Sequence, residues 1–155
     1  DNELIMAKSD IWNVLSSKES SSLSRLRAKL EATQAEQERL ILKMADIDVY
    51  IEEYSTRSRE ASSDGLADFR VLHHSMNLIS QLSEAKQSLS LVYKGLEENV
   101  VVLRNKITHH EMERLKFNKI GERNREKVGQ ALEKRSTALS DAMALQQFVS
   151  SGFGR

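Results

Sequence analysis

The first half of the chain repeats apolar residues at alternating spacings of three and four. Eight of the ten positions in this repeat are apolar, and the full set is Leu23, Leu26, Leu30, Thr33, Gln37, Leu40, Met44, Ile47, Ile51 and Tyr54. This spacing predicts a long α-helix that carries a coiled-coil stripe. Thr33 and Gln37 interrupt the stripe with polar side chains, which set the register of coiled coils at some cost in stability.

A polar break, Ala61 to Gly65, follows this helix, and Ser63 or Asp64 can cap a helix that starts after it. A second repeat then runs through Leu66, Phe69, Leu72, Met76, Ile79, Leu82, Ala85, Leu89, Val92, Leu96, Asn99 and Leu103. Its phase becomes ambiguous through Ile107, Met112, Leu115 and Phe117, and it resumes at Val128, Leu132, Arg135, Leu139, Ala142, Gln146 and Val149. The simplest interpretation of the two repeats and the polar break is a helix, a turn and a second helix.

We therefore predict an all-α fold, a long antiparallel two-helix coiled-coil hairpin that forms a single domain over residues 1–155. The first helix spans about residues 8–60, the turn 61–65, the second helix 66–149, and a disordered tail 150–155. With a turn near residue 62, Tyr54 faces Phe69 to Leu72 and Ile11 faces the neighbourhood of residue 114. Roughly the last 30 residues then overhang with an apolar stripe. This stripe either folds back, pairs with another subunit or binds a partner protein, and we favour the partner protein.

Composition supports an extended helical protein. The chain of 155 residues has no proline, no cysteine and 30% charged residues. Without proline nothing forces a kink, and without cysteine there are no disulfides or thiolate metal sites, which fits a reducing cytoplasm. Charge is neutral overall but segregated. Residues 31–68 hold ten acidic and four basic side chains, net −6, whereas residues 104–135 hold ten basic and five acidic, net +5. Solvated helix faces with many i,i+4 ion pairs explain the density of charge but not its segregation, whereas a charge gradient would steer opposite ends of the molecule toward different partners.

Motifs for catalysis are absent: the chain has no phosphate-binding or dinucleotide-binding glycine loop, no zinc-protease motif and no nucleophile elbow. Because a two-helix hairpin offers no concave site, we expect neither an enzyme nor a cofactor. His109 and Glu113 could jointly touch a metal, but two exposed ligands do not make a closed site, so we expect no metal either.

Nucleic acid and membrane insertion are also disfavoured. The basic segment 114–127 is interleaved with Glu122 and Glu126 and belongs to a neutral chain, which makes a poor phosphate binder. The longest unbroken apolar run, Val100 to Leu103, falls far short of the roughly 18 residues of a membrane span. We expect a cytoplasmic protein without direct membrane insertion.

Three stretches resemble the FliJ and YscO family, the coiled-coil stalk proteins of flagellar and virulence type III export ATPases. The opening Trp12 to Glu19, with Leu23 and Leu26 after it, is similar to the family's start. Tyr50-Ile51-Glu52-Glu53-Tyr54 resembles the tyrosine-containing segment before the family's inter-helix loop. Phe69 with Leu72 and Met76 resembles the opening of its second helix.

This resemblance implies a non-enzymatic bacterial stalk that inserts its paired termini into a hexameric ATPase ring, while the hairpin reaches the export gate protein at the inner membrane. Export chaperones are further partners that it implies. Matched by position, the export-gate contacts are Ile47, Tyr50, Tyr54, Phe69, His73 and Met76. The ATPase-ring contacts at the paired termini are Trp12, Leu15, Lys18, Arg25, Arg123, Arg125 and Lys127.

An alternative function remains open. The chain could be a coiled-coil scaffold, or an adaptor that binds export chaperones, dimerising through the stripe from Val128 to Val149. Tyr50 is the residue that distinguishes an interaction surface near the turn from simple packing between the helices. It precedes the stripe residue Ile51 and so lies off the stripe. Packing within the stripe would equally explain Ile47, Tyr54, Phe69 and Met76.

Overall fold

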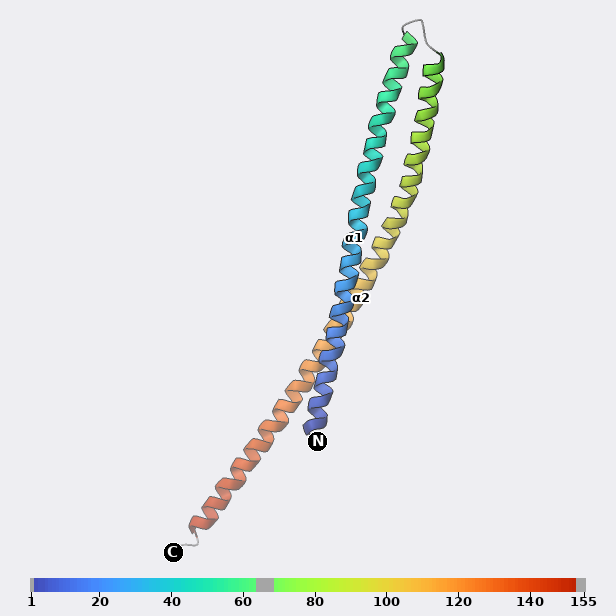
Figure 1. Ribbon diagram of the computed structural model, residues 1–155. Coiled ribbons are helices and arrows are strands. Elements are labelled where there is room, and N and C mark those ends of the chain that lie inside the picture. Colours follow the sequence, from blue (N-terminus) through green and yellow to red (C-terminus); the bar gives the residue numbers. More distant parts are fainter. Residues whose placement is uncertain (1, 64–68, 153–155) are drawn as a thin grey trace. The chain divides into compact units, whose positions relative to one another are not determined.

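Two long helices make up the described structure. The computed structural model describes the backbone of residues 2–63 and 69–152, and the side chains of 11–63 and 69–152. Helix α1 spans Asn2–Ser63 and helix α2 spans Phe69–Gly152 (Figure 1). The two helices pack against each other, which confirms the prediction of an all-α helical hairpin.

The helix ends differ from the predicted bounds. α1 continues through residues 61–63, where the sequence predicts a turn, and the remaining turn residues Asp64 and Gly65, with Leu66, lie outside the described residues. α2 continues to Gly152, so Ser150 and Ser151 are helical rather than part of a disordered tail.

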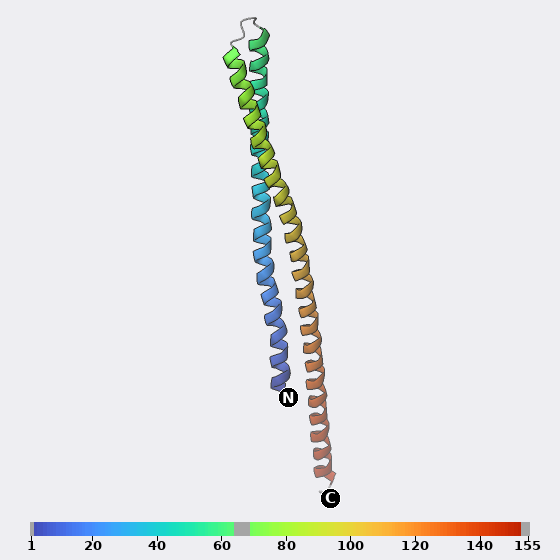
Figure 2. The same cartoon turned by 90° about the vertical axis from the view of Figure 1, so that its right-hand side faces the viewer.

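Contacts divide the chain into two compact units. The central unit comprises residues 25–107, and the terminal unit combines residues 1–24 with 108–155. In the central unit, α1 and α2 run side by side in opposite directions (Figure 1, Figure 2). Each unit therefore joins a stretch of α1 to a stretch of α2 that is distant from it in the sequence.

The predicted stripe of α1 is confirmed. All ten of its positions from Leu23 to Tyr54 are buried or half-buried, and Leu23 and Leu40 are only 1% and 3% exposed. The polar Thr33 is half-buried in this stripe, and its hydroxyl is satisfied because it donates a hydrogen bond to the carbonyl of Lys29, 2.8 Å away.

The predicted stripe of α2 is partly wrong. In the central unit the buried and half-buried positions at alternating spacings of three and four are Leu72, Ser75, Ile79, Leu82, Lys86, Leu89, Tyr93, Leu96, Val100 and Leu103. Four of the predicted positions lie one residue away from this stripe and are exposed, namely Met76, Ala85, Val92 and Asn99. Phe69 is also exposed, at 79%. The error arose because Met76, Ala85 and Val92 are more apolar than the polar residues beside them that occupy the stripe.

Lys86 shows how a charged residue occupies the stripe. Its Nζ lies 2.6 Å from Oδ1 of Asp48 on α1, so the ammonium reaches past the apolar contacts to a carboxylate. This pairing also sets which residues face each other. The two helices are antiparallel and have the same rise per residue, so a residue six positions after Asp48 faces a residue six positions before Lys86. Tyr54 therefore lies opposite about residue 80 rather than Phe69 to Leu72.

The terminal unit corrects the second predicted pairing. The Ser16 hydroxyl donates a hydrogen bond to Oδ1 of Asn118, 2.6 Å away. Ile11 therefore lies opposite about residue 123 rather than residue 114. Beyond Val128, which is half-buried, every residue from 129 to 152 is exposed. The overhang of α2 is present, and it starts later than the sequence predicts.

Candidate interaction surfaces

The terminal unit is held by an aromatic contact beside a glycine. The rings of Trp12 and Phe117 lie with centroids 6.0 Å apart and planes tilted by 31°. Gly121, one turn further along α2, is buried, and a Cβ placed there would lie 3.4 Å from Cβ of Trp12. A side chain longer than a methyl group at Gly121 would therefore have to displace Trp12 or push the two helices apart.

Polar pairs extend this contact along the helices. His110 Nδ1 meets Oε2 of Glu19, and both side chains are largely covered. Arg114, one turn after His110, has a buried Nε without a hydrogen-bond partner among the described residues. The stripe of α2 continues here through His110, Arg114, Phe117, Gly121, Asn124 and Val128, all buried or half-buried. Its polar members made the phase ambiguous in the sequence.

The residues predicted to contact an ATPase ring fall into two kinds. Trp12 and Leu15 are half-buried in the terminal unit, so packing already uses part of their surface. The four predicted contacts of this unit that are cations are exposed: Lys18, Arg123, Arg125 and Lys127. None of the four forms an ion pair with a side chain that the structure describes. Arg25 is exposed and belongs to the central unit.

The residues predicted to contact an export gate are also of two kinds. Ile47 and Tyr54 are half-buried in the stripe of α1. Tyr50 is 52% exposed, in agreement with its position off the stripe, and α2 contributes the exposed Phe69, His73 and Met76. Since Tyr54 lies opposite about residue 80, Phe69 is displaced from it by roughly 16 Å along the helix axis. The six residues spread along the central unit rather than forming one compact patch.

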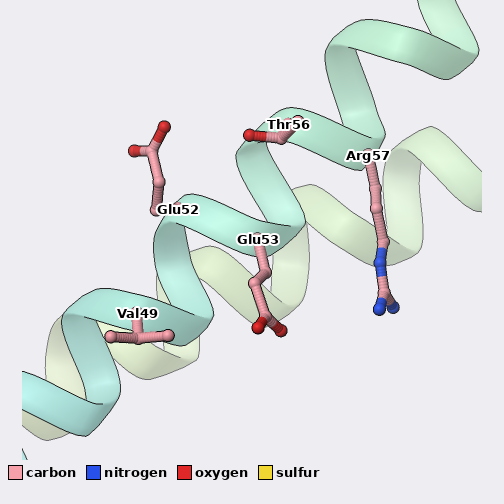
Figure 3. A pocket seen from close by; sticks show the side chains of 5 residues that line it. All are labelled: Val49, Glu52, Glu53, Thr56 and Arg57. Atoms are coloured by element: carbon pink, nitrogen blue, oxygen red, sulfur yellow. The ribbon is translucent and has the colours of Figure 1, made fainter.

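A shallow groove near Tyr50 was not predicted. Five α1 residues line it, with a volume of about 510 Å³: Val49, Glu52, Glu53, Thr56 and Arg57. Figure 3 shows Glu53 and Arg57 extending the same way from successive turns, while Glu52 extends the opposite way. The Arg57 guanidinium lies 5.5 Å from the centroid of the Tyr54 ring. The sequence signal for this surface was Val49, an apolar residue off the stripe.

Large apolar side chains are exposed along residues 129–152 of α2, here called the exposed segment. Six large apolar side chains of this segment are exposed: Leu132, Leu139, Met143, Leu145, Phe148 and Val149. Its charges are Glu133, Lys134, Arg135 and Asp141, which sum to zero. No described residue buries these side chains, so they are available to a partner.

Neither a metal centre nor a membrane span emerges from the described residues. No three His, Asp or Glu side chains of these residues gather where they could hold a metal ion. His109 instead lies edge-on to His110, with ring centroids 5.6 Å apart. Within the described helices, no stretch is apolar enough over a sufficient length to cross a bilayer. Comparison of the chain with protein-family models, with curated proteins and with solved structures returns no match.

Proposed function

We propose that this chain is the non-enzymatic stalk of a type III protein export apparatus, and that its termini bind a hexameric export ATPase. The observation that carries the proposal is the exposed segment, which is helical throughout and yet leaves its large apolar residues in solvent. A helix that leaves this many large apolar side chains in solvent is expected to be covered by another protein surface. The choice of an export ATPase as the covering protein rests on the resemblance to the FliJ and YscO family.

The charge of the terminal unit supports docking in a ring. Arg123, Arg125 and Lys127 lie directly before the exposed segment, and Lys18 is on α1 of the same unit. All four are exposed and unpaired with the described side chains. Cations that surround an apolar anchor favour a partner whose entrance is acidic, because the charges accelerate encounter and the anchor provides affinity.

Tyr50 supports a second contact, to the export gate protein. Tyr50 is half exposed, and it follows Val49, which lines the groove that also contains Glu52 and Glu53. Aromatic residues of this kind are common anchors at protein interfaces. The Tyr50→Ala variant should therefore weaken binding to the gate protein. The matched control is Tyr93→Ala, which removes a half-buried stripe residue and should lower the melting temperature without a specific effect on gate binding.

Binding to the purified ATPase tests the main proposal. The double variant Leu132→Asp with Leu139→Asp places charges on two exposed leucines that lie on the same side of the exposed segment, and it should weaken binding at least tenfold in calorimetry. The matched control is Leu91→Asp, because Leu91 is an equally exposed leucine of the central unit. Equal binding by the wild type and the double variant would exclude the exposed segment as the docking surface.

A scaffold or chaperone-binding adaptor is the second candidate function. The same observation favours it, since an exposed apolar face also suits dimerisation. An adaptor would bind no export ATPase, whereas a stalk would. The calorimetric experiment with the wild-type chain therefore separates the two functions.

A further inference from the structure

The exposed segment carries a stripe that is complementary to itself. Its members are Leu132, Arg135, Leu139, Ala142, Gln146 and Val149, at alternating spacings of three and four. All six are exposed, so none of them is buried by the part of the chain that the structure describes. Four of the six are apolar, and the two polar members, Arg135 and Gln146, are placed almost symmetrically about the centre of the stripe.

Symmetry decides what this stripe can pair with. In an antiparallel pair of two exposed segments, Leu132 of one copy can lie opposite Val149 of the second copy. Leu139 then lies opposite Ala142, and Arg135 lies opposite Gln146, and each of these pairs occurs twice. Apolar residues meet apolar residues throughout, and the arginine meets an amide whose oxygen accepts its hydrogen bond.

Other registers lack this match. If the copies slide by one heptad, so that Leu132 lies opposite Ala142, Arg135 is placed against Leu139 and its charge is desolvated without a partner. In a parallel pair in register, Arg135 meets the Arg135 of the second copy, and the like charges repel. If the copies slide by one heptad the other way, so that Leu139 lies opposite Val149, Leu132 and Arg135 lose their partners. The antiparallel register centred between Ser140 and Asp141 is the one that pairs all six positions and avoids these penalties.

Charge and length allow the pairing. The exposed segment is neutral, so two copies do not repel each other. Its residues 129–152 are about 36 Å long as a helix, and the antiparallel register overlaps them almost completely. The remaining charged side chains, Glu133, Lys134 and Asp141, lie off the stripe and stay in water.

We infer that, when no other protein covers it, the exposed segment pairs antiparallel with the same segment of a second copy of this chain. This pairing needs no export component. If the proposed function holds, the second copy and the ATPase compete for the same stripe, so that the free protein is kept from exposing Leu132, Leu139 and Val149. The pairing and the stalk function can thus fail independently.

Single cysteines test the orientation directly. The chain has no cysteine, so Leu132→Cys and Val149→Cys each introduce one thiol, at an exposed position where folding is not at risk. After mild oxidation, the antiparallel register predicts a covalent dimer only when the two variants are mixed, because residue 132 then meets residue 149. Either variant alone should stay monomeric on a non-reducing gel.

A matched pair of substitutions at Gln146 tests the register without cross-linking. Gln146→Glu creates two ion pairs in the dimer, because residue 146 of each copy lies opposite Arg135 of the other copy. It should lower the dissociation constant of the dimer about three- to tenfold in sedimentation equilibrium. Gln146→Lys should weaken it by a similar factor. Covalent dimers from either cysteine variant alone, the absence of dimers from the mixture, or equal effects of Gln146→Glu and Gln146→Lys would each overturn the inference.

Discussion

Gly121 provides a direct test of how the terminal unit is packed. A Cβ at this buried position would lie 3.4 Å from Cβ of Trp12, which is ordinary van der Waals contact. Alanine therefore fits, whereas any longer side chain must displace Trp12 or push the helices apart. At Gly95, in the central unit, a Cβ would meet nothing within 4 Å. Gly95 is thus the matched control for every change at Gly121.

The expected magnitudes follow from this geometry. Replacing glycine by alanine inside a helix stabilises it by about 1 kcal/mol, so Gly121→Ala and Gly95→Ala should both raise the free energy of unfolding by about that amount. Leucine is nearly as good a helix former as alanine, so Gly95→Leu should behave like Gly95→Ala. Gly121→Leu adds an overpacking penalty of about 1–3 kcal/mol against Trp12.

Urea denaturation followed by the fluorescence of Trp12 measures the effect where it arises, because Trp12 is the one tryptophan of the chain. The difference between leucine and alanine should be about 1–3 kcal/mol at position 121 and close to zero at position 95. Circular dichroism then follows unfolding in the Trp12→Ala background, where the penalty of Gly121→Leu should shrink, because the side chain it displaces is gone. Equal differences at the two positions, or a penalty that persists in that background, would refute the proposed contact.

Three further changes test other parts of the structure. Leu23→Ala should destabilise the protein by about 2–5 kcal/mol in urea denaturation, because Leu23 is fully buried, whereas Leu139→Ala should change stability by less than about 0.5 kcal/mol; similar losses would contradict the burial pattern. The side-chain hydrogen bond from Arg39 lowers the pKa of Glu36, so the stabilisation from this pair is present at neutral pH and is lost as the pH falls through the lowered pKa. Arg39→Gln should raise the pKa of Glu36 in an NMR titration, and an unchanged titration would show that the pair does not form in solution. Tyr50→Ala should leave helicity and melting temperature almost unchanged, and a fall of many degrees with intact gate binding would assign Tyr50 to the core instead.

The stripe of α1 could be predicted because most of its positions are apolar and the spacing is regular. The stripe of α2 could not, because several of its positions are polar and each is accommodated by a contact that the sequence does not reveal. Lys86 reaches Asp48, and His110 meets Glu19. A periodicity argument counts such residues as interruptions and moves the stripe to apolar neighbours such as Met76.

The sequence also did not reveal which residues of the two helices lie opposite each other. The polar break suggested a turn near residue 62, yet α1 continues through Ser63 and α2 starts at Phe69. A shift of the turn by a few residues moves every facing pair by twice as many, which is why Tyr54 lies opposite about residue 80. The exposure of Tyr50 was predicted correctly, since it depends on the α1 stripe alone.

The rate of ATP hydrolysis by a purified hexameric type III export ATPase tests the proposed function most directly. Addition of the wild-type chain should raise this rate, and the variant Arg123→Glu, Arg125→Glu, Lys127→Glu should not. A control variant with the same change in charge, Lys29→Glu, Lys43→Glu, Lys94→Glu, alters exposed cations of the central unit and should stimulate like the wild type. No stimulation by the wild type, or the same loss in both variants, would contradict the account of this chain as an ATPase stalk.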